Sequence, residues 1–412
     1  VHREHPFYDA LLFVHGRRLL QGSLVGRGIT EFHGFKYNQY KEGRRALLEL
    51  HLRDLRNELV RMYLGERIPW GEQYISTNPD VPHWARVVRE IHARNQHVIR
   101  WWVENRQTES GELGGGWGDD VEVLRAWAPI LILGDANSAG RAGMRKIVDG
   151  AWKKAYGGLD AGFVRKIHDV EHSAEPTADT QPLMLMFEPE NNLYVERNKK
   201  LLPLVKDLWT DEGPDGNLYF KSAWIGADGF DPAPDFRAYV PYHTRAIKGL
   251  TWLAWHGQYP EVEETWLRLA DTWVKACLSE ANGKLSGVVP AAIDWKTGEV
   301  GSGRGSWYRP QLNWSYFNWG LGNHNHVFGL LTSAYLETGD EAYMEPVFRC
   351  VQEALKYEPR EGYTPPAPPR GELPTVERQR YMLHAWHKTG FYVPYLLAYR
   401  LMSGNQRFPG YF

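Results

Sequence analysis

Apolar residues recur at three- and four-residue spacing in several stretches of the chain, which is the pattern of amphipathic helices with one buried stripe. In residues 46–64 the predicted buried stripe consists of Leu48, Leu52, Leu55, Leu59 and Met62. The same spacing predicts helices over residues 84–103, 121–133, 198–209, 243–256, 261–278, 326–337, 343–355 and 388–402. Strand patterns are few and short, and the best of them covers residues 287–293.

Long loops rich in glycine, proline, asparagine and aspartate separate these helices. They cover residues 68–82, 109–120, 211–241, 294–324 and 358–374. Loops of this length inside a compact domain tend to carry function. The pattern predicts an all-α fold with few short strands, either an α/α toroid, complete or incomplete, or an irregular helical bundle. No linker composition divides the chain, so residues 1–412 are treated as one domain, with a fragment of a longer chain as the alternative.

The composition excludes several classes of protein. Charged residues make up 24% and hydrophobic residues 43%, which is typical of a soluble globular protein. The 48 basic and 50 acidic residues nearly cancel, so the broad positive field of a nucleic-acid-binding protein is absent. No run of about 20 apolar residues could span a membrane. No charged and then apolar leader follows Val1, so any targeting peptide is expected outside this chain.

Aromatic residues are abundant, with 18 Trp, 22 Tyr and 15 Phe, and many of them stand among polar residues. Residues 307–326 read WYRPQLNWSYFNWGLGNHNH, with Trp307, Tyr308 and Trp314 near Asn and His side chains. Aromatic rings cover the C–H face of a sugar while polar neighbours address its hydroxyls, so this stretch is a candidate sugar cleft. The alternative interpretation is a large aromatic core, with Asn323 or Asn325 as a helix cap.

A glycine-rich loop lies inside residues 101–124, which read WWVENRQTESGELGGGWGDDVEVL. Asp120 is explained as a helix N-cap, but three consecutive glycines are not, because they indicate close approach of a ligand or of another backbone segment. The predicted contributors to a cleft here are Asn105, Arg106, Trp117 and Asp119. No phosphate-binding motif is present.

Two further stretches carry titratable side chains. In residues 168–182, His168, Glu171 and His172 would share one helical face, but Pro176 is expected to interrupt that helix. Their spacing resembles an inverted zinc-protease motif, and a polar helix end is the simpler interpretation. In residues 236–257, Tyr242, His243 and Arg245 stand at the mouth of a predicted helix. A tyrosine beside a cation could transfer protons, and semi-buried packing is the alternative.

The many-helix pattern, the aromatic rim rich in Asn and His, and the Tyr-His-Arg helix mouth together resemble the α/α-toroid polysaccharide lyases, with uronate-active toroid hydrolases as neighbours. The resemblance implies cleavage of a uronic-acid-containing glycan by β-elimination. In these lyases an Asn, His or Arg neutralises the uronate carboxylate. Here Asn323, or Asn105 with Arg106, would have that role.

The resemblance also implies a base and an acid. His324 or His172 would remove the C5 proton, Tyr242 would protonate the leaving oxygen, and His243 is a further catalytic candidate. The other residues expected to bind substrate are Trp117, Asp119, Arg245, Trp307, Tyr308, Trp314 and His326.

Two other functions remain open. Hydrolysis would need two carboxylates across the glycosidic bond, for which Asp119, Glu171, Glu188 and Glu190 are available. A helical sugar-binding module would need only the rings. No cofactor is expected, although a divalent cation such as calcium is an option at the carboxylates of residues 228–235, whose spacing fits no calcium loop. The expected partner is an oligo- or polysaccharide, with no nucleic acid and no membrane, and secreted or periplasmic location follows from that substrate. No oligomeric state is predicted.

Overall fold

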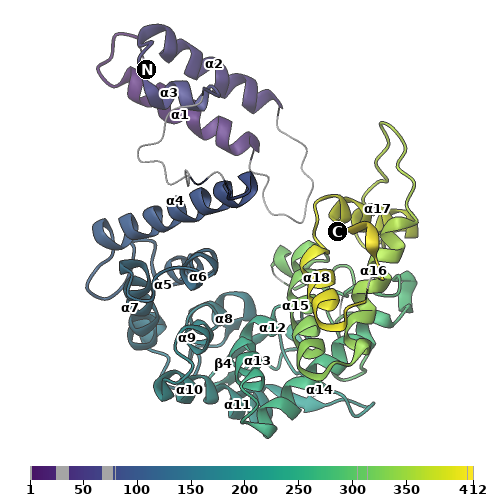
Figure 1. Ribbon diagram of the computed structural model, residues 1–412. Coiled ribbons are helices and arrows are strands. Elements are labelled where there is room, and N and C mark those ends of the chain that lie inside the picture. The colour runs from purple at the N-terminus through teal and green to yellow at the C-terminus, as the bar shows by residue number, and fades with distance from the viewer. Residues whose placement is uncertain are drawn as a thin grey trace. The chain divides into compact units, whose positions relative to one another are not determined.

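The computed structural model describes residues 2–24, 37–66, 78, 80–303, 305–312, 314–405 and 407–411. Over these residues the protein is mostly helical, with a few very short strands, so the all-α class expected from the sequence is confirmed. The chain divides into two compact units, Val1–Ala93 and Arg94–Phe412 (Figure 1). The boundary falls inside helix α4 (His83–Asn105), where no linker composition marks it, so the sequence pattern predicts one domain.

Unit 1 contains helices α1 (Tyr8–Leu24), α2 (Tyr37–Arg53) and α3 (Glu58–Tyr63). Helices α1 and α2 pack against each other, and α2 also contacts α3. The buried core of this unit consists of Leu20, Leu47, Leu50 and Val60. Most of the predicted loop at 68–82 lies outside the described residues.

The stripe predicted to be buried in residues 46–64 is exposed. Its five members, Leu48, Leu52, Leu55, Leu59 and Met62, are between 37% and 78% exposed. Two features account for this difference. The face of α2 that carries Leu47 and Leu50 packs into the core. The chain also breaks between α2 and α3, within the stretch for which the pattern predicts a single helix.

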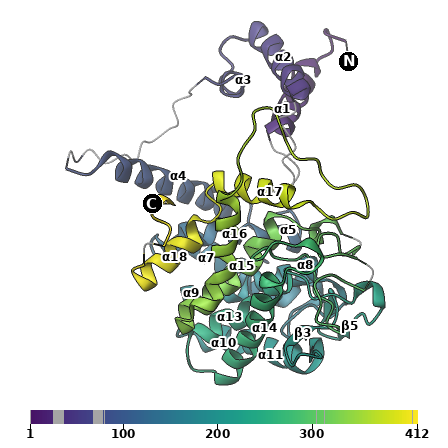
Figure 2. The same ribbon diagram turned by 90° about the vertical axis from the view of Figure 1, so that its right-hand side faces the viewer.

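Unit 2 contains the C-terminal part of α4 and all later helices. Their bounds are α5 (Trp117–Glu122), α6 (Leu124–Ile132), α7 (Ala139–Lys154), α8 (Val170–Ala178), α9 (Gln181–Phe187), α10 (Asn192–Lys199), α11 (Leu201–Pro203), α12 (His243–Ala246), α13 (Lys248–Trp255), α14 (Pro260–Leu278), α15 (Leu321–Thr338), α16 (Glu345–Leu355), α17 (Val376–Lys388) and α18 (Val393–Ser403). Helices α9 and α10, α13 and α14, and α16 and α17 pack as successive pairs (Figures 1 and 2). The short helices α8 and α12 pack against each other and carry much of the candidate site.

Most helices of unit 2 agree with the sequence pattern, including α4, α14, α15 and α16, although α15 begins five residues before the predicted start. The region 198–209 holds the end of α10, then α11 and a π-helical turn (Leu204–Trp209). The pattern misses α7, α9 and α17. Helix α7 is rich in glycine because it packs very closely: a Cβ at Gly150 would lie 1.9 Å from the carbonyl oxygen of Ser110.

The strands are shorter than expected and lie elsewhere. Strands β1 (His168–Asp169), β4 (Trp224–Gly226) and β5 (Gly229–Phe230) form one antiparallel sheet in the order β1-β4-β5. Strands β2 (Thr210–Glu212) and β3 (Leu218–Phe220) form a second antiparallel pair. The strand predicted at 287–293 is wrong, since only Ile293 takes part in isolated bridges, to Tyr239 and Val300. The pairing of β1 with β4 fixes the start of α8.

Much of the aromatic excess belongs to the core. Among the largest fully buried side chains are Trp209, Trp266, Trp273, Trp307 and Trp386. Cys277 and Cys350 are also buried, and neither forms a disulfide. Among the described residues, none of the helices combines the length and the apolar character that a bilayer crossing requires.

Candidate functional site

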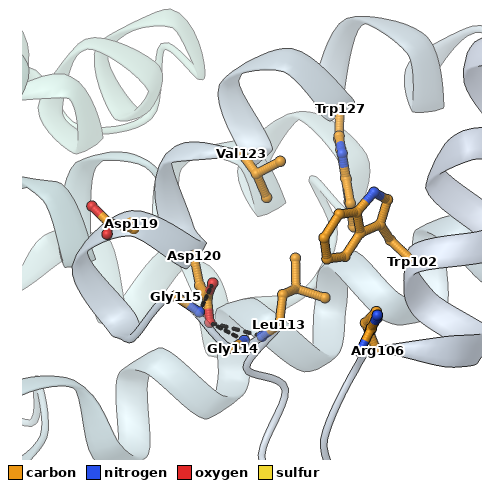
Figure 3. Close-up of a pocket in the computed structure, with 9 residues that line it drawn as sticks. All are labelled: Trp102, Arg106, Leu113, Gly114, Gly115, Asp119, Asp120, Val123 and Trp127. Atoms are coloured by element: carbon orange, nitrogen blue, oxygen red, sulfur yellow. Dashed lines mark hydrogen bonds between the residues drawn. The ribbon is translucent and has the colours of Figure 1, made fainter. Parts of the chain in front are cut away.

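The glycine-rich loop before α5 is held in place by Asp120. The buried carboxylate of Asp120 accepts backbone N–H groups from Leu113 at 2.7 Å, Gly114 at 3.1 Å and Gly115 at 2.9 Å (Figure 3). A Cβ at Gly115 would lie 2.8 Å from Oδ1 of Asp120, so the loop passes too close for a side chain there. Asp120 therefore fastens the preceding loop to α5, and it is not the helix N-cap predicted from the sequence, because α5 begins at Trp117.

His172 stands in the first turn of α8 beside a buried carboxylate. Asp169 caps this helix by accepting the backbone N–H of His172 at 3.2 Å, and its side chain is fully buried. The same carboxylate accepts the His172 Nδ1–H at 2.9 Å. His168 lies on β1, and its Nδ1 is 2.5 Å from the other oxygen of Asp169. Since Nδ1 of His172 is occupied, Nε2 is the nitrogen left for a ligand.

A surface pocket of about 400 Å³, called here the His172 pocket, opens beside this dyad. Its lining consists of Gly115, Gly116, Trp117, Gly118, Asp119, Tyr156, His172 and Glu175. The pocket thus brings together Trp117, Asp119 and His172, three of the candidate site residues named from the sequence. It also contains two titratable residues, Tyr156 and Glu175, that are not among the candidates named from the sequence.

Tyr156 reaches the His172 pocket from the turn after α7. Its backbone has φ 49°, a left-handed conformation that is uncommon for a tyrosine and that often occurs at functional sites. A Cβ at Gly118 would lie 3.2 Å from Oη of Tyr156 and 3.4 Å from Oε2 of Glu175, so both polar atoms approach one point. Burial, followed by the negative charges of Glu175 and Asp119, raises the pKa of Tyr156. The hydroxyl therefore keeps its proton at neutral pH.

Glu175 is the carboxyl group whose acidity is most altered at this site. Burial raises the pKa of Glu175 to about 7, and the charges of Glu171 and Asp179 add to the shift while Arg245 opposes it. Glu175 and Glu171 are one helical turn apart on α8, and Oε1 of Glu171 lies 3.3 Å from the Arg245 guanidinium. Oε1 of Glu175 also lies 3.6 Å from the same guanidinium, but burial outweighs this contact and favours the protonated form of Glu175.

Arg245 is buried at the centre of these acids and does not reach solvent. Its guanidinium donates to Asp179, to Glu122 at 3.1 Å and to Glu171 at 3.3 Å. Its side chain is 5% exposed. The prediction that Arg245 binds substrate is therefore wrong, because its donors already hold α8 and α5 together. Helix α8 also continues through Pro176, contrary to the interruption expected there.

An aromatic group flanks His172 on the side of the loop before α15. The ring of His172 lies 5.1 Å from that of Trp314, which is 39% exposed.

Tyr242 packs 4.5 Å from the ring of His326 and 5.5 Å from that of Phe317. Burial and the charge of Glu171 raise the pKa of Tyr242 to about 12. Burial and the nearby arginines lower the pKa of His326 to about 3. Tyr242 and His326 thus pack against each other, and neither of them lines the His172 pocket.

Two predicted catalytic histidines are instead core residues. His243 is fully buried, with Nε2 2.9 Å from the carbonyl oxygen of Ser222 and Nδ1 3.0 Å from the backbone of Val240. His324 is fully buried as well, with Nδ1 2.9 Å from the carbonyl oxygen of Gly320 and Nε2 accepting an N–H at 3.2 Å. Burial lowers the pKa of His243 to about 4 and that of His324 to about 3. Their predicted roles are wrong because backbone groups occupy both rings.

Several predicted substrate-binding residues also lie elsewhere. Asn323 and Trp307 are fully buried, and Trp307 donates its indole N–H to the carbonyl oxygen of Asn282. Tyr308 packs 5.6 Å from the buried ring of Trp319. Asn105 is exposed at the end of α4 and donates its amide to the carbonyl of Trp101. None of these four lines the His172 pocket, and the first two have no exposed surface with which to contact a sugar.

Two groups of side chains in the described part of the chain converge closely enough to hold a metal ion. They are His168, Asp169 and His172, and Glu122, Glu171 and Glu175, with donor atoms within 4.8 Å of one another in each group. The carboxylates proposed for calcium are used locally: Asp228 lies 3.3 Å from Arg165, and Asp231 accepts the N–H of Ala233.

The sequence does carry signals for Tyr156 and Glu175. Tyr156 follows the end of α7 and directly precedes Gly157 and Gly158, where a strained turn is common. Glu175 is four residues after Glu171, which places both on one helical face once α8 is known to continue. The chain matches no protein-family model, no curated protein and no solved structure.

Proposed function

We propose that this protein is a polysaccharide lyase that cleaves a uronic-acid-containing glycan by β-elimination at the His172 pocket. The observation that carries the proposal is that His172, oriented by the buried Asp169, shares one pocket with Tyr156 and Glu175. A base, a proton donor and a neutral carboxylic acid around one small hollow are the groups that this reaction requires.

His172 is the proposed base. Its Nδ1–H bond to Asp169 fixes the tautomer and leaves the Nε2 lone pair to take the C5 proton of the uronate. Asp169 also stabilises the imidazolium that forms, in the way that a buried carboxylate does in a catalytic triad. Proton removal by a positioned base contributes about 10²- to 10⁴-fold in rate.

Glu175 is the proposed partner of the substrate carboxylate. The C5 proton is weakly acidic while the carboxylate beside it keeps its full negative charge. A protonated Glu175 donates a hydrogen bond to that carboxylate and stabilises the enolate as charge develops, and one preorganised donor contributes about 3 kcal/mol. A pKa of about 7 keeps Glu175 largely protonated in mildly acidic solution.

Tyr156 is the proposed acid. As the C5–H electron pair forms the C4–C5 double bond, the C4–O bond breaks, and Tyr156 gives its proton to the departing oxygen. Its raised pKa means that the phenol is protonated before the step. The proton taken by His172 then passes to solvent and a solvent proton restores Tyr156, so the enzyme returns to its starting state.

The surroundings of the pocket support a sugar ligand. Trp117 lines it and Trp314 is beside His172, so ring faces are available for the apolar side of a pyranose. The proposal includes an α/α-toroid arrangement, supported by the successive packed helix pairs of unit 2. It also includes a secreted or periplasmic location, because a polymeric substrate is met outside the cytoplasm.

Glycoside hydrolysis is a second candidate. It is favoured by the contrast between Glu175, whose pKa burial raises to about 7, and Glu171, which lies closer to Arg245, at 3.3 Å against 3.6 Å. Such a contrast separates an acid from a nucleophile, and retaining enzymes place these groups about 5 Å apart. However, Glu171 is bound to a buried arginine and does not line the pocket, so it is poorly placed to attack a sugar.

One assay distinguishes these functions from a non-catalytic sugar-binding module. The protein is incubated with a panel of uronate-containing glycans while ultraviolet absorbance and reducing ends are followed together. Elimination gives an absorbing unsaturated product together with reducing ends, hydrolysis gives reducing ends alone, and a binding module gives neither. Tyr156→Phe should abolish most of the absorbance change, whereas Tyr363→Phe, a matched change at an exposed tyrosine in another loop, should not. Equal activity in both variants would overturn the assignment of Tyr156.

A further inference from the structure

A second hollow, called here the tryptophan pocket, opens between α4, the glycine-rich loop, α5 and α6, with a volume of about 570 Å³ (Figure 3). Trp102, Trp127, Leu113 and Val123 give it apolar walls, and Arg106 stands at its edge. All of these residues belong to unit 2. Its volume falls in the range of small-ligand sites.

The tryptophan pocket has one aromatic wall that a ligand can reach. The Trp102 side chain is 39% exposed, whereas Trp127 is 6% exposed and supports the floor. An exposed ring above a packed floor is the arrangement that binds the C–H face of a sugar. A purely structural tryptophan would bury its ring, as Trp209 and Trp266 do.

The charge available at this pocket is positive. Among the described residues no carboxylate pairs with Arg106, whose guanidinium lies 5.8 Å from the ring centroid of Trp101. The carboxylate of Asp120 is buried and already accepts three backbone N–H groups. Asp119 also lines the pocket, but Figure 3 shows it pointing to the opposite side of α5 from Trp102. An arginine with open donors beside a ring favours an acidic ligand.

The tryptophan pocket and the His172 pocket share a wall. Gly115 and Asp119 line both of them. Asp120 holds the loop that forms this wall, and Gly115 adds no side chain to it. The two pockets are therefore adjacent, so that one chain molecule can contact both.

We propose that the tryptophan pocket is a second sugar subsite, which binds an acidic sugar residue of the same oligosaccharide that enters the His172 pocket. Trp102 contacts the ring of that sugar, and Arg106 binds its carboxylate or sulfate. The proposal rests on the proposed function for its substrate class, and it adds that the protein recognises at least two successive sugars. It follows that short acidic fragments bind less tightly than longer ones.

The test is binding, measured without turnover. Uronate disaccharides and tetrasaccharides are titrated by calorimetry into the full chain carrying His172→Asn, which blocks the proposed elimination. Trp102→Ala and Arg106→Gln are then added separately, with Trp255→Ala as the matched control at an exposed tryptophan on α13. We expect Trp102→Ala to weaken tetrasaccharide binding about tenfold and disaccharide binding little. Arg106→Gln should weaken binding of acidic but not of neutral tetrasaccharides.

The outcomes separate this inference from the proposed function. Unchanged tetrasaccharide affinity in both Trp102→Ala and Arg106→Gln, or no measurable binding of acidic oligosaccharides, would overturn the subsite even if elimination occurs. Length-dependent binding that needs Trp102 and Arg106, without any elimination by the native chain, would uphold the subsite and overturn the reaction. Arg106 is exposed, so Arg106→Gln is expected to fold and remains informative if Trp102→Ala is unstable.

Discussion

The carboxylate of Asp169 lies 2.9 Å from Nδ1 of His172 and is completely buried at the start of α8. It fixes the orientation of the imidazole while it also caps the helix through the backbone N–H of the same residue. One side chain thus connects the folding of α8 with the reactivity of the His172 pocket.

Asp169→Asn should therefore reduce turnover far more than stability. Asn retains the helix cap, but its amide can donate to Nδ1 and favour the wrong tautomer, so kcat should fall about 10²- to 10⁴-fold. His168→Gln is the control, because His168 also contacts Asp169 but does not line the pocket. Steady-state kinetics and thermal melts check both variants. Loss of activity in His168→Gln equal to that in Asp169→Asn would contradict the assigned role of His172.

Much of the fold and part of the site could be predicted from the sequence. Periodicity identified the long helices such as α14, because apolar spacing reports which face is buried. It chose the wrong stripe at Leu48 and Leu52, because that choice depends on the partner helix. It could not separate His172 from His324 either, since both stand among polar residues and only packing decides which ring is open. Glu175 was missed because Pro176 suggested that the helix ended.

The acidity of Glu175 predicts the pH dependence of the reaction. A pKa of about 7 means that Glu175 loses its proton, and with it the neutral donor form, as pH rises through about 7. Activity that depends on this form should fall over the same pH range. Glu175→Gln keeps a neutral donor at every pH. The ratio of variant to native activity should therefore rise with pH between about 6 and 8. A ratio that is constant with pH would show that the protonation of Glu175 does not matter.

The same group affects folding stability with a definite sign. The pKa of Glu175 is raised above the ordinary value of 4.5, so the folded state binds the proton more tightly than the unfolded state. The free energy of unfolding should fall as pH rises from about 4.5 to about 7. In Glu175→Gln this part of the decline should disappear. Denaturant unfolding at several pH values measures it, and an identical pH profile in both proteins would contradict the assigned shift.

The close approach of two polar groups to Gly118 predicts a variant that separates activity from stability. A Cβ there would lie 3.2 Å from Oη of Tyr156 and 3.4 Å from Oε2 of Glu175, so Gly118→Ala should displace both groups and lower kcat. Because Gly118 is inside α5, Ala should also favour the helix by up to about 1 kcal/mol. Gly329→Ala is the control, since no atom lies within 4 Å of its Cβ position in α15. Kinetics and unfolding of both variants check this prediction. An undiminished kcat in Gly118→Ala would contradict the proposal that Tyr156 and Glu175 act together beside Gly118.

The convergence of His168, Asp169 and His172 predicts inhibition by zinc. Two imidazoles and a carboxylate within 4.8 Å of one another form a set of ligands that Zn²⁺ binds readily. An ion bound there would occupy the dyad that orients His172, so added Zn²⁺ should lower the rate of elimination, and EDTA should restore it. His168→Gln should weaken this inhibition, because it removes one ligand and leaves His172 with Asp169. Activation by Zn²⁺, or loss of native activity in EDTA, would instead make the ion part of the reaction and would require a different role for His172.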